Sequence, residues 1–248
     1  MDKYLNKIIQ GDCLEVMKEI KDKSIDMILC DLPYGTTACK WDTIIPFEPL
    51  WKQYKRIIKD NGAIVLTASQ PFTSALVMSN PDMFKYCWYW IKNATGFLNA
   101  KKMPMKNVED VCVFYKNLPI YNPQNLIKIN KPKTNHNSKA RLLKTSKGLS
   151  THNGGRLTKD YIQEFSNYPK QALQFSNEKG LHPTQKPVAL FEYLIKTYTN
   201  ENDLILDNCA GSGTTAIACI NTKRNYILIE KEKEYYDIIL KRIKETNT

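Results

Sequence analysis

The chain has 248 residues, a formal net charge of +11 and seven cysteines, and this length suffices for one α/β core with a modest insertion. No apolar run approaches the roughly 18 to 20 residues of a membrane span, and the amino terminus lacks the apolar block of a signal peptide. The cysteines show no CxxC pairing and the three histidines no metal-ligand spacing, so we expect free thiols in a reducing, cytoplasmic compartment and no metal site.

Short apolar runs alternate along the chain with amphipathic segments, and this alternation predicts an α/β fold with helices on both faces of a mostly parallel sheet. Strands are expected near 7–10, 25–30, 63–67, 86–91, 110–115, 204–206 and 226–229. Helices are expected near 13–20, 47–58, 71–78, 187–197, 214–221 and 232–244. No internal repeat is evident.

The first motif, Asp31-Leu32-Pro33-Tyr34, follows the strand predicted at 25–30, and open α/β sheets bind ligands at this end of a strand. A carboxylate and the Leu32 carbonyl can each accept a hydrogen bond from an amino group, and the Tyr34 ring can stack, as a flipped base requires. Pro33 ends the strand and restricts the approach of Tyr34. Alone, the motif is also typical of an ordinary Pro-Tyr turn.

The second motif is a glycine-rich turn at 207–215, between the strand predicted at 204–206 and the helix at 214–221. Glycines there let the backbone approach a nucleotide-like cofactor, and an acid about 20 residues on can hold a ribose. Glu230 ends the next predicted strand and fits that position. The spacing also fits a tight turn, and it does not distinguish a nicotinamide cofactor from S-adenosylmethionine.

Together the two motifs resemble those of the DNA amino-methyltransferases of the beta arrangement, in which the catalytic motif comes first and the cofactor loop last. The family signatures are Asp-Pro-Pro-Tyr and Asp-Pro-Phe-x-Gly-Ser-Gly-Thr, so Leu32, Asn208 and Cys209 are substitutions. Stretches at 8–15, 90–100 and 182–187 are also similar to family segments. The substitutions put cofactor affinity, more than reaction type, in question.

The resemblance implies a Rossmann-like, S-adenosylmethionine-dependent methyltransferase with a seven-stranded sheet, one strand of which is antiparallel. By resemblance, Asp12 would accept from the cofactor adenine, Glu230 would bind the ribose, and Thr184 with Lys186 would hold the carboxylate. The catalytic set is Asp31, Leu32, Pro33 and Tyr34. The cofactor set is Asp12, Cys13, Thr184, Lys186, Asp207, Cys209, Ala210, Gly211, Ser212, Gly213, Thr214 and Glu230.

Most of the net positive charge lies in one segment, since 117–182 holds 11 Lys or Arg against three acids, a net +8 of the +11 of the chain. Such a composition also fits a solvated insertion. Between catalytic and cofactor motifs, it is better interpreted as an arm that binds duplex DNA. We therefore divide the chain into a catalytic half at 1–116, a target-recognition insertion at 117–180 and a cofactor half at 181–248. Candidate phosphate contacts are Lys139, Arg141, Lys144 and Lys147.

The function that these features predict is direct methyl transfer to the exocyclic amino group of a flipped adenine. Asp as the first motif residue favours adenine over the cytosine amino group, which stays the alternative. A cytosine-carbon methyltransferase would need a Pro-Cys pair, which the chain lacks. A nicotinamide oxidoreductase would not explain the basic segment, and a non-catalytic DNA-binding protein would leave the cofactor motifs unused. The sequence leaves open a homodimer and a cognate restriction endonuclease as partners.

Overall fold

The computed structural model describes residues 3–37, 39, 42–93, 100–135, 161–178 and 185–246, with backbone alone at 131–135 and 161. Contacts divide the chain into two compact units, which we describe separately: Met1–Asn122 with Lys170–Thr248, and Pro123–Pro169. No helix among the described residues is both long and apolar enough to cross a membrane. The division into catalytic, recognition and cofactor segments stays a prediction.

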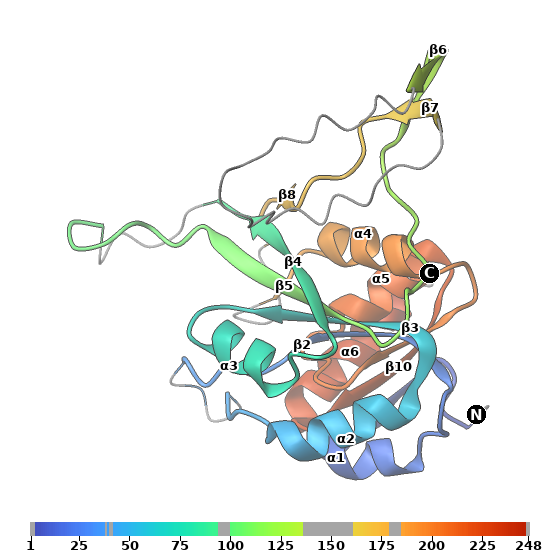
Figure 1. The fold of residues 1–248 in the computed structure, drawn as a ribbon. Helices are drawn as coiled ribbons and strands as arrows, with labels where there is room; N and C mark the ends of the chain where they lie inside the picture. Colours follow the sequence, from blue (N-terminus) through green and yellow to red (C-terminus); the bar gives the residue numbers. More distant parts are fainter. Residues whose placement is uncertain are drawn as a thin grey trace. The chain divides into compact units, whose positions relative to one another are not determined.

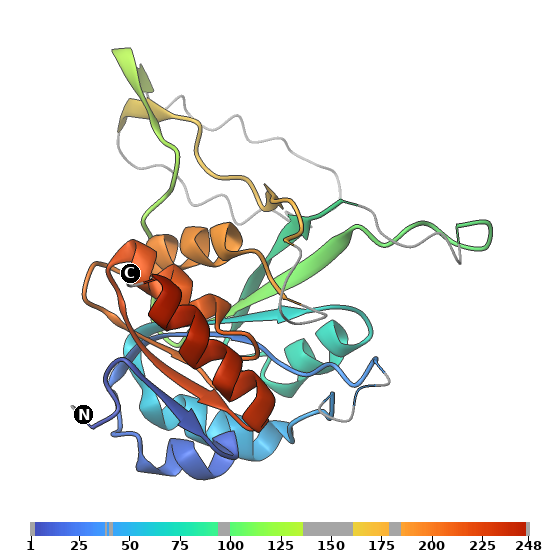
Figure 2. The same ribbon diagram turned by 180° about the vertical axis from the view of Figure 1, so that it is seen from behind.

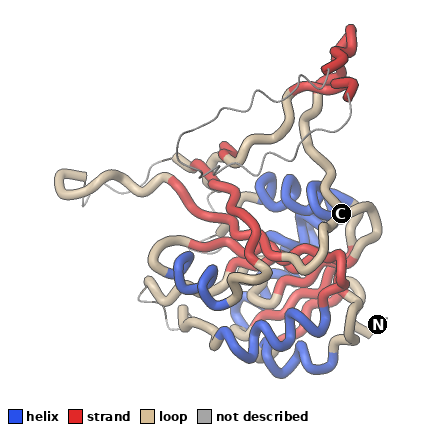
Figure 3. Tube along the Cα trace, viewed as in Figure 1, coloured by secondary structure: helices blue, strands red, loops and turns tan. Residues whose placement is uncertain are grey.

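The larger unit is built on an eight-stranded sheet (red in Figure 3). The strand order is β1 (Lys7–Gln10), β10 (Asn225–Glu230), β9 (Leu204–Asp207), β2 (Ile25–Asp31), β3 (Ile58–Ala68), β5 (Val108–Phe114), β4 (Phe84–Ile91) and β8 (Ala172–Gln174). All neighbours pair in parallel except β5, which is antiparallel to both β3 and β4. The predicted α/β fold is confirmed, and the three-residue edge strand β8 adds an eighth strand.

Three helical segments cover each face of this sheet (Figures 1 and 2). One layer consists of α1 (Cys13–Val16) with the 3-10 turn η1 (Met17–Glu19), α2 (Phe47–Ile57) and α3 (Phe72–Ser79). The other consists of α4 (Val188–Tyr198), α5 (Thr214–Thr222) and α6 (Lys233–Thr246). In α2 the buried side chains are Leu50, Trp51, Tyr54 and Ile57. Tyr54 lies three or four residues after the first two and Ile57 three residues after Tyr54, so the four side chains form one stripe that faces the sheet.

The alternation of side chains along each strand decides which layer a functional residue faces. In β2, Ile28 and Cys30 join the core under α1–α3, whereas Met27 and Leu29 join the core under α4–α6. Asp31 continues the second series and therefore projects toward α4–α6. By the same alternation Asp207 of β9 and Glu230 of β10 project toward that layer, because Ile205 and Leu228 belong to its core.

The chain reverses its direction of travel across the sheet between β9 and β2. From β2 it proceeds to β3 on one side, and from β9 to β10 on the other, while β2 and β9 themselves pair in parallel. Ligands of open α/β sheets bind at such a switch point, beyond the carboxyl ends of the strands. The motif after β2 and the motif after β9 are therefore brought to one place, although 176 residues separate Asp31 from Asp207.

Two elements of the larger unit differ from the sequence expectation. The helix expected at 13–20 tightens into the 3-10 turn η1 at Met17. Strand β3 begins at Ile58 rather than 63, because the turn-like sequence Asp60-Asn61-Gly62 is absorbed at a register shift opposite β2. At Gly62 an added Cβ would lie 2.7 Å from the Asp26 carbonyl oxygen, so this close approach needs glycine.

The smaller unit contains a two-stranded antiparallel sheet of β6 (Ile127–Asn135) and β7 (Tyr161–Ser166). Ile127 pairs with Ser166 and Asn135 with Tyr161, with a register shift between Lys128 and Lys133. Neither strand was expected from the sequence, because Lys, Asn and Pro interrupt the apolar alternation that indicates a strand.

Candidate active site

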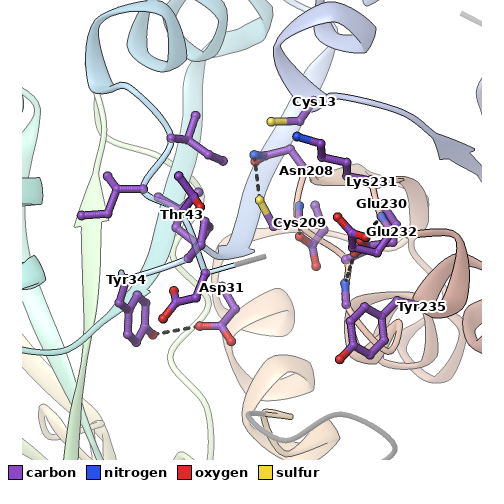
Figure 4. A pocket seen from close by; sticks show the side chains of 18 of the residues that line it. Cys13, Asp31, Tyr34, Thr43, Asn208, Cys209, Glu230, Lys231, Glu232 and Tyr235 are labelled. Carbon is purple, nitrogen blue, oxygen red and sulfur yellow. Dashed lines mark hydrogen bonds between the residues drawn. The ribbon is translucent and has the colours of Figure 1, made fainter. Parts of the chain in front are cut away.

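A cavity of about 330 Å³ opens at the carboxyl ends of β2, β9 and β10. In Figure 4, Asp31 and Tyr34 lie on one side of it, and Glu230, Glu232 and Tyr235 on the other. The cavity brings together both motifs and the other predicted site residues. Those that line it are Asp12, Cys13, Asp31, Leu32, Pro33, Tyr34, Lys186, Asp207, Cys209, Ala210, Gly211, Ser212, Thr214 and Glu230. Gly213 belongs to the same turn without lining the cavity. Thr184, Lys139, Arg141, Lys144 and Lys147 lie outside the described residues.

Asp31 is held through both of its carboxylate oxygens. Oδ1 accepts from the Tyr34 hydroxyl at 2.8 Å and from the Thr67 hydroxyl, and Oδ2 accepts from Lys186 Nζ at 2.7 Å. Asp31 pairs directly with Thr67 across β2 and β3, so the sheet register itself places this hydroxyl. The carboxylate is thus oriented before any ligand arrives, with Oδ2 toward Lys186.

Tyr34 supports Asp31 as well as shaping the cavity wall. Its ring stacks on Phe72 of α3, with centroids 5.2 Å apart and planes at 24°. Burial raises the pKa of Tyr34 well above its ordinary value, and the Asp31 carboxylate raises it further. The phenol therefore stays protonated and donates its hydrogen to Asp31. The predicted stacking of Tyr34 on a base stays a prediction.

Lys186 enters the site from the residues just before α4. It is 5% exposed and lies between two carboxylates, with Nζ 2.7 Å from Asp31 Oδ2 and 3.5 Å from Glu109 Oε2. Burial lowers the pKa of Lys186, but these two carboxylates raise it by more, so its pKa lies above the ordinary value. The ammonium is therefore charged. The sequence resemblance assigned Lys186 to the cofactor, a role that stays a prediction.

The glycine-rich turn after β9 depends on two glycines with positive φ, Gly211 at 52° and Gly213 at 79°. L side chains rarely adopt this backbone conformation. At Gly213 an added Cβ would also lie 2.8 Å from Ile239 Cγ2 of α6, so packing as well as conformation requires glycine. The turn leads into α5 at Thr214, whose hydroxyl donates to the Lys186 carbonyl at 3.3 Å.

Glu230 fixes the opposite wall of the cavity. Its Oε2 accepts from the Gly211 amide at 2.7 Å and its Oε1 from the Glu232 amide at 2.8 Å. Burial raises the pKa of Glu230, and these amides partly oppose that effect. Asp12, the other predicted acid, caps α1 by accepting from the Leu14 amide at 2.9 Å, and it also lines the cavity. Two acidic side chains, both predicted to bind the cofactor, therefore border the cavity.

Asp207 and Asn208 join the turn to the core. Asp207 accepts from the Cys209 amide at 3.1 Å and from the Thr215 hydroxyl, and burial raises its pKa to about 6. Asn208, where the family signature has proline, accepts from the buried Tyr54 hydroxyl of α2. This substitution is thus matched by a polar partner, which a sequence motif by itself cannot reveal.

The segment 35–46 was missed by the sequence reasoning. Thr43, Ile44, Ile45 and Pro46 line the cavity. Asp42, which is 8% exposed, accepts from the amides of Gly35, Thr36 and Thr37 at 2.7–2.9 Å. Burial raises the pKa of Asp42, yet these donors lower it by more, leaving it below the ordinary value. The only sequence signal was an acid after a turn of small residues.

Other lining residues absent from the prediction are Gly11, Leu14, Thr36, Thr37, Asp42, Gln185, Phe191, Asn208, Lys231, Glu232 and Tyr235. Most of them flank a predicted motif by one to five residues, so they could have been found by extending each motif. Phe191 and Tyr235 lie on α4 and α6, and the sequence gives no signal that those helices reach the site.

Comparison with known proteins gives consistent matches over nearly the whole chain. The family model described as DNA methylase, of the N6/N4 methyltransferase type, matches residues 25–241. The Type II methyltransferase M2.MboI of Moraxella bovis is 31% identical, over 98% of this chain and 89% of its own. The DNA adenine methyltransferase YhdJ of Escherichia coli (strain K12) is 28% identical, over 95% and 82%. The protein in the crystal structure of an M1.HpyAVI–SAM complex is 27% identical in sequence to this chain. The two structures superpose with a TM-score of 0.64, over 95% of this chain and 98% of that protein.

Proposed function

The chain belongs to the DNA methylase family of the N6/N4 type, and from this premise we propose that it methylates the exocyclic amino group of adenine in duplex DNA. S-adenosylmethionine is the methyl donor. The family match confirms the resemblance recognised from the motifs, and with it a DNA methyltransferase. The finer elements of the proposal are the adenine target, the residue roles and the partners.

One observation carries the proposal: a fixed carboxylate acceptor and a cofactor-type turn face a single cavity. Asp31 and Leu32 line this cavity together with the turn around Gly211. Both come from adjacent parallel strands at the switch point of the sheet. A base amino group and a sulfonium methyl group would therefore be held within one enclosed space.

The chemistry assigned to Asp31 follows from its charge and its fixed orientation. The amino nitrogen of a base is a poor nucleophile, because its lone pair is delocalised into the ring. Positive charge develops on that nitrogen as its bond to the methyl carbon forms. A preorganised carboxylate stabilises this charge more than it stabilises the neutral amino group, which lowers the barrier. Asp31 therefore need not be protonated before the methyl group moves, and the Leu32 carbonyl accepts the second amino hydrogen.

The residues present fit the cofactor. A cavity of about 330 Å³ lies within the usual range of roughly 300–1,000 Å³ for small-molecule sites. When bound, S-adenosylmethionine supplies an electrophilic methyl group on its sulfonium. Glu230 and Asp12 would accept from its hydroxyl and amino groups, and the turn at Gly211 would pass close to it. The hydrogen bonds that Glu230 accepts from backbone amides hold its carboxylate in place for that contact.

Adenine is favoured over cytosine by two observations. The first residue of the catalytic motif is Asp31, and Ser is frequent there among cytosine-amino enzymes. A relative that matches 95% of the chain is named a DNA adenine methyltransferase. The N4 amino group of cytosine stays the second candidate, since the same acceptors can bind it.

Partners and compartment complete the proposal. Relatives named Type II methyltransferases support a restriction-modification role, in which a cognate endonuclease would act on the same site. The basic segment at 117–180 is proposed as the arm that binds duplex DNA. The described cysteines are all free thiols, which favours the reducing cytoplasm. A homodimer is a further proposal, and light scattering of the purified protein tests it.

The deciding experiment is expression in a host that lacks DNA methylation, followed by modified-base sequencing of its DNA. We expect N6-methyladenine at one short sequence, and none with the Asp31→Asn variant. N4-methylcytosine in place of N6-methyladenine would select the second candidate. Absence of both, with folded protein that binds S-adenosylmethionine, would refute methyl transfer to DNA.

A further inference from the structure

A row of polar side chains crosses the sheet beside the catalytic acid. Asp31 of β2 pairs with Thr67 of β3, and Glu109 of β5 pairs with Trp90 of β4. By strand alternation Thr67 and Glu109 project to the α4 side, because Val65 and Val111 belong to that core. Lys186, just before α4, lies over this row. The acid and the lysine thus share a face with a second buried acid.

Glu109 is the second carboxylate beside Lys186. Its side chain is 12% exposed, with Oε1 accepting from Lys92 and Oε2 lying 3.5 Å from Lys186 Nζ. Among the described residues Glu109 Oε2 makes no hydrogen bond, although it is fully buried. Lysines and carboxylates therefore alternate in a chain of contacts, in the order Lys92, Glu109, Lys186 and Asp31. Within this chain Glu109 Oε2 can still accept a hydrogen bond.

The contacts of Asp31 create a requirement for that capacity. The proposed function needs Asp31 to accept from a base amino group, yet Oδ1 already serves two hydroxyls and Oδ2 serves Lys186. One acceptor site is left on Oδ2, beside the Lys186 ammonium, and the amino group binds there more closely when that ammonium draws back. A buried ammonium that gives up part of its contact with one carboxylate is stabilised when a second carboxylate takes it. Glu109 Oε2 is positioned to do so with a movement of under about 1 Å, since a strong N–H···O contact is about 2.7–2.9 Å.

We infer that Glu109 is a positioning residue for the reaction, which receives the Lys186 ammonium as the target amino group takes Asp31 Oδ2. The inference rests on the proposed function. Lys186 thereby moves between two acceptors, and the line of charges stays balanced in both arrangements. Lys92 keeps Oε1 of Glu109 occupied, so that Oε2 is the oxygen left for Lys186.

The test compares Glu109→Gln in two backgrounds. The amide keeps the shape of the side chain but not its charge, so Lys186 should stay on Asp31 and compete with the base. We expect single-turnover methyl transfer to slow at least tenfold at saturating S-adenosylmethionine, with the cofactor dissociation constant within twofold of wild type. Because Glu109 acts through Lys186, the same substitution should slow a Lys186→Met variant by less than twofold.

The matched control is Asp110→Asn on the same strand. Asp110 projects to the other face, where it accepts from Thr73 of α3 at 2.6 Å, so we expect a rate within twofold of wild type. If Lys186→Met does not fold, Glu109→Asp takes its place. Its retained carboxylate should recover at least part of the rate lost in Glu109→Gln, whereas equal losses in the two variants would overturn the inference.

Three other results would also overturn the inference. A wild-type rate in Glu109→Gln would remove the role altogether, and an equal loss in both backgrounds would assign Glu109 to the packing of β5. Weaker binding of S-adenosylmethionine by Glu109→Gln would assign Lys186 to the cofactor. An active wild type with any of these results leaves the proposed function standing, whereas a wild type that methylates no DNA refutes that function.

Discussion

Replacing Asp31 by asparagine tests the central assignment with little change of shape. Thr67 and Tyr34 donate hydroxyl hydrogens to Oδ1, and hydroxyls can rotate to accept from an amide instead. The variant can therefore still turn its oxygen toward a base amino group. What it loses is the negative charge, which should change the reaction far more than the binding of either substrate.

The size of the effect follows from that single loss. Removing one preorganised group that stabilises transition-state charge costs about 3–4 kcal/mol, which is roughly 10²–10³ in rate. We expect the single-turnover rate of methyl transfer to fall by at least this factor. Cofactor affinity, measured by calorimetry, should stay within threefold of wild type, because no cofactor contact is assigned to Asp31.

Asp26 provides the control on the same strand. It accepts from Lys59 Nζ at 2.6 Å and from the Leu204 amide at 3.0 Å, about 16 Å from Asp31 at 3.3 Å per residue. Asp26→Asn should therefore lower stability without slowing methyl transfer. A rate for Asp31→Asn within threefold of wild type would refute the reasoning. So would a slow rate restored by excess cofactor, since Asp31 would then belong to the cofactor site.

Three further changes test the cofactor side of the cavity, the buried Asp207 and the basic segment. Glu230→Gln should weaken S-adenosylmethionine binding about 10-fold by calorimetry, as charge-assisted hydrogen bonds contribute about 1.5–3 kcal/mol, while the exposed control Glu234→Gln should not. Asp207, with its pKa raised to about 6, binds a proton in the native but not the unfolded chain between about pH 4 and 6. The protonated Asp207 thus stabilises the fold fully below about pH 4, and this stabilisation, about 3 kcal/mol in the free energy of unfolding, is lost as pH rises through 6. In denaturant titrations the free energy of unfolding should fall less over this pH range in Asp207→Asn than in wild type. Lys139, Arg141, Lys144 and Lys147 are to be neutralised together. This variant should bind all DNA duplexes more weakly, and its DNA affinity should depend less on salt, while its affinity for the cofactor stays unchanged. Unaltered affinity and salt slope would place the recognition arm elsewhere.

The acids at the ends of strands were predictable from the sequence because each follows a buried apolar run. Asp31, Asp207 and Glu230 all end such runs, and parallel strands present their carboxyl ends at one edge of the sheet. The positions of these three residues therefore required no knowledge of tertiary contacts. The same reasoning predicted seven strands of the large sheet, although it began β3 five residues late at the Asn61-Gly62 turn.

Contacts that leave no apolar period in the sequence were not predictable in this way. The three amide donors to Asp42 shape a segment with no apolar period, and the hydroxyl that satisfies Asn208 comes from Tyr54 of another layer. Strand β8 has three residues, too few to show an alternation, and exists because it pairs with the exposed edge of β4. Each feature depends on a partner that only the folded chain brings near.

The contact between Lys186 and Asp31 joins two segments whose proximity the order of motifs along the chain does not indicate. The residues are 155 positions apart, with the basic segment between them, yet both belong to the larger unit, as do Thr67, Glu109 and Lys92. Among the described residues, the hydrogen bonds that orient Asp31 thus form inside the larger unit. Asp31 and Glu109 both lie within 3.5 Å of the Lys186 ammonium, so the surroundings of Asp31 include β5 as well as its own motif. A signature that names only Asp, Pro and Tyr therefore identifies the proposed acceptor, while the second carboxylate beside its lysine comes from a strand that no motif marks.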